Sequence, residues 1–174
     1  MLEIEIKARV QSLEAVEAEL REKGARYLGE EEQVDAYFNH PCRDFAQTDE
    51  ALRLRRAGGR VMLTYKGRKL DAVTKTREEV SLAVESYEAA RQILAKLGFV
   101  EVAKVRKLRR RYSLGEYLVE LDFVADLGSF VEVEKKGETY SPEELLEFLA
   151  SLGIGRDAVE RRSYLELLLG EGDG

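Results

Sequence analysis

The sequence has one cysteine and one histidine, and these two shortages narrow the chemistry available to it. Because Cys42 is alone, no disulfide can form within the chain, which favours a cytoplasmic location. Because His40 is the only histidine, a zinc site built from cysteine and histidine ligands is excluded as well. Any metal must therefore be held by carboxylates, the ligands that favour Mg²⁺ or Mn²⁺.

Long apolar runs are also missing. No stretch approaches the roughly 18 apolar residues that a membrane-spanning helix needs, and a charged strand begins almost at Met1, so we expect neither a membrane anchor nor a signal peptide. The hydrophobic fraction of 44% is nevertheless too high for a disordered chain. A length of 174 residues suits one domain. We predict that this domain covers residues 1–169 and that residues 170–174 form a flexible tail.

The chain is acidic overall, although basic residues are common in it. Its 34 acidic and 28 basic residues give a formal net charge of −6. The run KVRKLRRRY, residues 104–112, taken alone suggests nucleic-acid binding. A duplex-binding domain is usually basic as a whole, however, and the alternate residues of a strand point to opposite faces. We therefore interpret the run as a strand of a sheet and expect no nucleic-acid partner.

Four segments carry helix signals. They lie between Ser12 and Gly24, between Ser86 and Gly98, between Ser141 and Gly153, and over Ser163–Leu169. Each of the first three begins with a serine at the N-cap position and ends with a glycine just past the last turn, which is the usual asymmetry of helix ends. Between the caps, apolar residues recur at helical spacing, so each helix has one face to bury.

The remaining segments predict strands. They are the opening stretch MLEIEIKARV and then Tyr27–Asn39, Ala51–Ala57, Arg60–Lys66, Thr74–Ala83, Phe99–Tyr112, Glu116–Ala125 and Ser129–Lys136. Short turn signals such as AGGRV, SLGE and DLGS connect several of them, which favours antiparallel pairing. About eight evenly spaced strands with interspersed helices predict an α+β protein built on a barrel.

Charge alternates with apolar residues along nearly every predicted strand. In the opening strand Glu3, Glu5 and Lys7 share one face, and isoleucines occupy the other. Likewise, Arg53 and Arg55 alternate with leucines. Further strands place Lys75, Arg77 and Glu79 on one face, Lys107 with Arg109, Glu120 with Asp122, and Glu132 with Glu134. An ordinary half-solvated sheet would explain any one of these strands.

Taken together, the strands favour a closed barrel with a charged lumen and helices packed outside. A solvent face normally mixes serine, threonine and lysine, whereas here arginine and glutamate recur at strand centres. Buried charges need counter-charges. The inward cations, which call for a polyanion, are Lys7, Arg53, Arg55, Lys66, Arg77, Lys107 and Arg109. The inward carboxylates, which call for a divalent metal, are Glu3, Glu5, Glu79, Asp122, Glu132 and Glu134. A polyphosphate with Mg²⁺ or Mn²⁺ satisfies both sets.

These residues resemble the CYTH superfamily, the triphosphate tunnel metalloenzymes. Residues 3–7, EIEIK, match the family's ExExK signature. The segments DAYFNHPCRDFAQTDEALRLRR, TYKG, TREE and LDFVADLGSFVEVE, together with Lys107, Arg109 and Tyr112, follow in the family's order, so the resemblance covers about residues 1–165. It is strongest to the class IV adenylate cyclase branch. It implies a closed eight-stranded antiparallel tunnel, a triphosphate substrate, metal-dependent chemistry and, from the cyclase-like relatives, a homodimer.

The roles expected of the side chains follow from their chemistry and from this resemblance. Arginine forks suit phosphate oxygens, and lysines act as point charges along the phosphate chain. We expect the seven inward cations named above to bind the triphosphate, with the choice between Lys104 and Lys107 left open. We expect Glu3, Glu5, Glu132 and Glu134 to bind metal, with Glu79 and Asp122 either binding metal or orienting cations, and we expect Glu5, Lys7 and Glu134 to be catalytic.

The nucleophile decides the reaction, and the sequence leaves it open. Attack by the 3′-hydroxyl of ATP would make cyclic AMP and pyrophosphate, which the resemblance to the cyclase branch favours. Attack by water would make the enzyme a triphosphatase acting on inorganic triphosphate, thiamine triphosphate or a nucleoside triphosphate. A non-catalytic binder of polyphosphate or of a phosphorylated ligand is a third alternative, which the full set of carboxylates disfavours.

Overall fold

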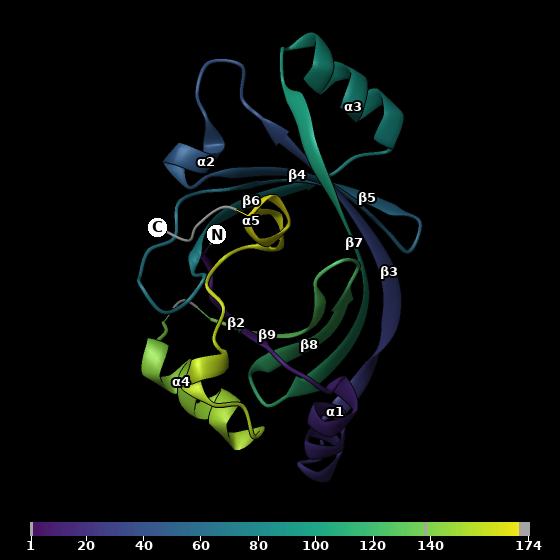
Figure 1. The fold of residues 1–174 in the computed structure, drawn as a ribbon. Coiled ribbons are helices and arrows are strands. Elements are labelled where there is room, and N and C mark those ends of the chain that lie inside the picture. Colours follow the sequence, from purple (N-terminus) through teal and green to yellow (C-terminus); the bar gives the residue numbers. More distant parts are fainter. Residues whose placement is uncertain (1, 138, 171–174) are drawn as a thin grey trace.

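The computed structural model describes residues 2–137 and 139–170, which form a nearly closed antiparallel barrel surrounded by helices (Figure 1). The strands are β1 (Leu2–Glu3), β2 (Glu5–Arg9), β3 (Arg26–Asn39), β4 (Ala51–Ala57), β5 (Arg60–Lys66), β6 (Arg77–Ala83), β7 (Val100–Leu114), β8 (Tyr117–Val124) and β9 (Gly128–Lys135). The helices are α1 (Leu13–Glu22), α2 (Phe45–Thr48), α3 (Tyr87–Lys96), α4 (Pro142–Ser151) and α5 (Tyr164–Leu169), with a 3₁₀ turn at Arg156–Ala158. The strand order is β1-β6-β5-β4-β3-β7-β8-β9-β2.

The N-terminal segment closes the barrel. Its first part, β1, pairs with β6, and its second part, β2, pairs with β9. Ile4 lies at the break between the two, and its carbonyl accepts the backbone N–H of Lys135 at 2.8 Å. The described residues therefore form nine strands where the sequence predicted eight, because the first predicted strand is divided so that one segment can join both edges of the sheet.

The helix starts agree with the sequence predictions. The side chain of Ser12 accepts the N–H of Ala15 at 3.2 Å, and that of Ser86 accepts the N–H of Ala89 at 3.2 Å. Ser163 begins α5 in a reciprocal capping box. These bonds satisfy donors that would otherwise be unpaired in the first turn of each helix.

Two short helical segments were not predicted. One is α2, a single turn whose N-cap, Asp44, accepts the N–H of Ala46 at 3.1 Å. The helix ends at Asp49, which adopts the left-handed conformation with φ of 55°. The other is the 3₁₀ turn near the C-terminus. Elements of three or four residues are too short to show a 3.6-residue apolar period, so the pattern that reveals longer helices is absent from them.

A loop replaces the start of the strand predicted over Thr74–Ala83. The chain stays irregular over residues 67–76, and β6 begins only after that loop. Within the loop the Asp71 carboxylate accepts the backbone N–H groups of Val73 and Thr74 at 2.8 and 2.6 Å. Such bonds from an aspartate to nearby backbone compete with sheet formation and hold a turn instead.

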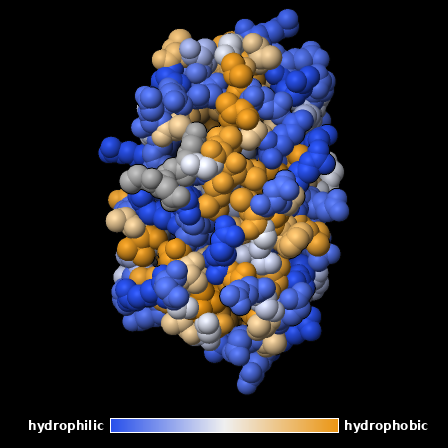
Figure 2. All heavy atoms as spheres, in the orientation of Figure 1, coloured by the Kyte–Doolittle hydropathy of each residue, from blue (hydrophilic) through white to orange (hydrophobic). Residues whose placement is uncertain are grey.

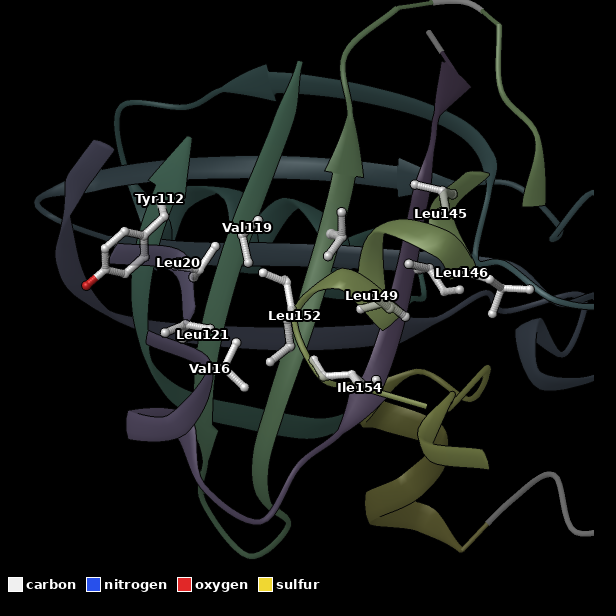
Figure 3. Close-up of a cluster of buried hydrophobic side chains, with 14 of the residues drawn as sticks. Val16, Leu20, Tyr112, Val119, Leu121, Leu145, Leu146, Leu149, Leu152 and Ile154 are labelled. Carbon is white, nitrogen blue, oxygen red and sulfur yellow. The ribbon is translucent and has the colours of Figure 1, made fainter. Parts of the chain in front are cut away.

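The largest hydrophobic core lies outside the barrel, under α1 and α4. The outward side chains of β2, β8 and β9 meet the apolar faces of these two helices (Figure 3). Leu121 and Val119 from β8 lie beside Leu20 of α1, and Leu149 of α4 is fully buried as well. On the other side of the barrel, α3 covers β3 and β4 with Leu94. Because the apolar faces are used outside, the charged faces of the strands point inward.

The C-terminal segment fills one part of the barrel interior. Tyr164 of α5 packs against Tyr37, Val105, Val124 and Phe130, which come from four strands. Apolar residues gather in the middle of the face seen in Figure 1, in the region where α5 lies (Figure 2). The interior is thus divided into an apolar part at α5 and a charged part.

Within the described residues, no helix is long and apolar enough to cross a membrane. The predicted tail over 170–174 begins at Gly170, which ends α5 with φ of 69°, and its other four residues lie outside the described part of the chain.

Candidate functional site

The inward side chains of the barrel surround a cavity of about 390 Å³. Most of the residues that the sequence placed on the charged face line it: Glu3, Glu5, Arg53, Arg55, Lys66, Arg77, Glu79, Arg109, Glu132 and Glu134. Lys75, Arg111, Glu120 and Tyr164 line it too. Acidic and basic side chains contribute to the wall in nearly equal numbers, so the lumen is close to electrically balanced.

Arg53 and Arg77 offer unused hydrogen-bond donors in the cavity. Among the described residues, the Nε groups of both are buried without a hydrogen-bond partner. One terminal nitrogen of Arg77 donates to the carbonyl of Gly67 at 3.3 Å, which fixes the orientation of its guanidinium. Burial alone would lower the pKa of Arg53, but Asp35 and the other acidic groups around it raise the pKa instead. The free donors of both arginines suit an anion.

Arg55 and Lys107 are already paired. Arg55 makes a bidentate contact with Asp35, with distances of 2.6 and 2.8 Å, and Lys107 Nζ lies 3.1 Å from the same carboxylate. Asp35 is fully buried, so it depends on these two cations. Burial lowers the pKa of Lys107 to about 8 despite the aspartate. Lys104, the other lysine considered for this position, is half exposed and pairs with Glu101 outside the lumen.

Two lysines bridge pairs of carboxylates across the cavity. Lys66 Nζ lies 2.6 Å from Glu3 and 3.0 Å from Glu79. Lys75 Nζ lies 2.5 Å from Glu5 and 2.9 Å from Glu132. Four of the carboxylates expected to bind metal are thus held by ammonium groups, and each ammonium is shared between carboxylates of two different strands.

Arg109 is the centre of the largest charge cluster. Its guanidinium contacts Asp122 through two nitrogens at 2.7 and 2.6 Å, Glu132 at 2.7 Å, and Glu120. All four side chains are buried. The sequence predicted Arg109 as a phosphate ligand and Asp122 as a metal ligand or an orienting group. The geometry favours the orienting role for Asp122, and it shows Arg109 gathering carboxylates from β8 and β9.

Glu134 is the carboxylate without a cation. Among the described residues, no ion pair includes it, whereas its neighbours in the cavity wall are mostly acidic. Burial, together with Glu120, Glu3 and Glu5, raises the pKa of Glu134 to about 7. Like charges gathered in this way disfavour ionisation unless a cation is added.

Lys7 lies behind Tyr164, away from the cavity wall. Its ammonium is 4.3 Å from the centre of the Tyr164 ring and donates to the backbone carbonyl of Arg162. Burial and the nearby Lys75 lower the pKa of Lys7 well below its usual range. The Tyr164 hydroxyl in turn donates to Asp122 at 2.7 Å. The structure thus places Lys7, Lys107 and Asp122 beneath α5, while the other predicted site residues face the cavity.

The donor set suits a hard divalent cation. Glu5 and Glu134 face each other in the β2–β9 pairing, and Glu132 is two residues further along β9. As the side chains stand, the described residues form no ready cluster of three metal-binding groups, because lysines occupy the carboxylate oxygens. Glu134 has no ion-pair partner among the described residues, and its acidic neighbours nevertheless favour a cation beside it. Oxygen ligands of this kind are those that Mg²⁺ and Mn²⁺ prefer.

The predicted site lacked four residues that stand out in the wall, namely Lys75, Arg111, Glu120 and Tyr164. The first three had a visible signal: Lys75 shares the inward face with Arg77, Arg111 shares one with Arg109, and Glu120 shares one with Asp122, so the alternation already pointed to them. Tyr164 had no such signal, because it reaches the lumen from a helix that the strand pattern does not describe.

The unequal pairing of the two neighbouring arginines leads to a prediction. Arg53→Ala should weaken the binding of inorganic triphosphate by about ten- to a hundredfold, because a charge-assisted contact contributes roughly 1.5–3 kcal/mol. It should change the melting temperature little. Arg55→Ala should also lower the melting temperature, because Asp35 loses its bidentate partner. Calorimetric titration and thermal melting of both variants check this, and wild-type affinity in both would show that phosphates do not bind at this strand.

The comparisons with known proteins agree with this fold. The CYTH domain model matches residues 1–164. A protein of Methanocaldococcus jannaschii, provisionally named an adenylate cyclase, is 41% identical over an alignment of 172 residues that covers 96% of this chain and 98% of the relative. The solved structure of PH1819 from Pyrococcus horikoshii OT3 has a TM-score of 0.88 at 39% identity, with 97% of this chain and 98% of that one covered.

A more distant solved structure shares the fold. It is a Hippeastrum protein provisionally named an adenylyl cyclase and described as having a dominant triphosphatase activity. The alignment covers 98% of this chain and 97% of that one with a TM-score of 0.68, and at 23% identity the likeness concerns the fold alone. The family model and the archaeal relative both span nearly the whole chain. The chain therefore belongs to the CYTH domain family.

Proposed function

We propose that this protein is a metal-dependent enzyme that binds a triphosphate in its barrel and converts ATP to cyclic AMP and pyrophosphate. One observation carries the proposal: the cavity combines unused arginine donors, at Arg53 and Arg77, with a carboxylate that lacks a cation, Glu134. The first feature calls for an anion and the second for a cation. A triphosphate with a divalent ion supplies both.

The charge balance of the cavity explains why the anion would need a metal. The carboxylates of the wall already neutralise most of its cations, so a bare triphosphate would bring about four uncompensated negative charges into a partly buried site. Arg53 and Arg77 would hold the phosphate oxygens, while Glu5, Glu132 and Glu134 would hold the metal. A bound Mg²⁺ or Mn²⁺ would neutralise the charge that grows on the phosphates during the reaction.

A hollow beside the cavity favours a substrate that carries an organic group. It measures about 80 Å³ and shares Tyr37, Ala51, Arg77 and Ser163 with the wall of the cavity. Phe45 of α2, together with Leu165 and Leu169 of α5, adds apolar surface to it. A substrate anchored by its phosphates at Arg77 could place a partly apolar group there. Inorganic triphosphate has no such group, whereas ATP has one.

The cyclase reaction also has a requirement that the site can meet. The 3′-hydroxyl of the ribose must attack the α-phosphorus and release its proton to a carboxylate of the wall or to water, while the bond to the departing pyrophosphate breaks, so the ribose must fold back over its own phosphates. Fixed arginine donors at the phosphates and a wall close to the organic group would restrict the substrate to such conformations, which is how positioning lowers a barrier.

Product analysis tests the proposal. The protein is incubated with ATP, inorganic triphosphate or thiamine triphosphate, each with Mg²⁺, with Mn²⁺ and with a chelator, and the products are separated by chromatography. We expect cyclic AMP and pyrophosphate from ATP, and no product when the metal is chelated. Phosphate release from any of the three substrates without cyclic AMP would show that the reaction is hydrolysis and not cyclisation. Turnover in the presence of the chelator would contradict the metal requirement.

A further inference from the structure

Lys75 reaches the cavity from a loop whose backbone is held in place. The loop over residues 67–76 is fixed internally by Asp71, and the backbone N–H of Lys75 donates to the carbonyl of Glu5 at 2.9 Å. The Cα of Lys75 therefore stays next to β2. Its side chain alone can change position, and because it lines the cavity wall it has open space in front of it.

The ammonium group of Lys75 stands between two carboxylates on different strands. Its distances are 2.5 Å to Glu5 and 2.9 Å to Glu132, and all three side chains are buried. A divalent ion held by Glu5 and Glu132 would need these same carboxylate oxygens as ligands. An ammonium and a metal ion cannot both take those positions, since the oxygens are shared and the two charges repel.

We propose that the ammonium group of Lys75 occupies the position of the metal between Glu5 and Glu132. It moves out of this position when metal and triphosphate bind together, while its backbone stays attached next to β2. The inference rests on the proposed function, because it assumes that these carboxylates bind metal. Lys75 keeps the two carboxylates close before the metal binds, so that they do not repel each other. It also opposes the binding of metal alone.

The same geometry explains why a triphosphate would favour the replacement of the Lys75 ammonium by a metal ion. A lysine displaced from its carboxylates would be a buried charge without a partner, which is costly. The cavity that Lys75 faces is also lined by the free donors of Arg53 and Arg77, so a triphosphate held there would be within reach of the displaced ammonium. Each ligand then increases the affinity for the other, and by linkage the two increases are equal.

The test measures Mn²⁺ binding directly. MnCl₂ is titrated into the protein without phosphate, and free Mn²⁺ is followed by electron paramagnetic resonance. Lys75→Met should bind Mn²⁺ at least tenfold more tightly than the wild type, because it removes the competing cation. Lys69→Met is the matched control, since it removes a buried lysine paired with Asp49 and Glu166 instead, and it should change Mn²⁺ affinity less than twofold.

A second titration measures the coupling. Inorganic triphosphate should increase the Mn²⁺ affinity of the wild type tenfold or more beyond its binding to Mn²⁺ in solution, and this increase should be much smaller in Lys75→Met. If Lys75→Met does not fold, Lys75→Gln, which keeps a donor but no charge, replaces it. Equal Mn²⁺ affinity in the wild type and the folded variant overturns the proposal.

The outcome is independent of the reaction catalysed. Tighter Mn²⁺ binding by the variant supports the role of Lys75 even if the product analysis finds no turnover of any triphosphate. Equal affinity rejects that role even if cyclic AMP is formed.

Discussion

Glu134→Gln is expected to reduce metal-dependent turnover at least a hundredfold while leaving the melting temperature unchanged or slightly higher. Glutamine keeps the shape of the side chain and removes the negative charge that a metal would bind. Burial, together with the acidic neighbours Glu120, Glu3 and Glu5, raises the pKa of Glu134 to about 7. Removing the negative charge therefore relieves repulsion in the folded state. Steady-state assays and thermal melting of the same preparations measure the two effects.

Opposite changes in activity and stability distinguish a functional carboxylate from a structural one. Glu5→Gln should lose activity to a similar degree, but its melting temperature should fall because Lys75 loses one partner. Glu116→Gln is the control, since that carboxylate is more than half exposed and lies 3.9 Å from Lys135. Wild-type turnover by both Glu5→Gln and Glu134→Gln would remove these residues from the metal site.

The direction of the strand faces could be predicted from the sequence, because alternation with period two is a local property. Glu3, Glu5, Arg53 and Arg55 face the lumen as the pattern indicates. The break at Ile4 could not be predicted in this way. It depends on how far apart the two edges of the sheet lie once the seven other strands have curved, which no local pattern records.

The sequence also could not predict which cations are free and which are paired with carboxylates. Arg53, Arg55 and Arg109 look alike in the pattern, since each directly follows a leucine in a predicted strand. In the structure the Nε of Arg53 is unpaired, Arg55 forms an ion pair with Asp35, and Arg109 contacts three carboxylates. Which cation meets which carboxylate follows from the register between strands, and that register is set by turns and by the barrel closure together.

Arg109→Met should lower the stability of the fold more than any other single change considered for the cavity. Removing one partner of a buried ion pair typically costs about 3–5 kcal/mol, because the remaining charge stays buried. Here the change removes the ion-pair partner of Asp122, the nearer of two arginines beside Glu120, and one of the cations paired with Glu132. At roughly 2–4 °C per kcal/mol for a chain of this size, the melting temperature should fall by on the order of 10 °C or more.

The cause of this loss of stability can be tested by removing one of the unpaired negative charges while the arginine stays absent. Asp122→Asn in the Arg109→Met background should recover several degrees, because the asparagine is uncharged and its oxygen can still accept the bond from the Tyr164 hydroxyl. Arg156→Ala, which breaks an ion pair in which both side chains are more than half exposed, should shift the melting temperature by no more than a few degrees. If Arg109→Met melts like Arg156→Ala, the buried carboxylates do not depend on Arg109. If Arg109→Met lowers the melting temperature strongly and Asp122→Asn does not raise it again, the loss of stability comes from lost packing and not from an unpaired charge.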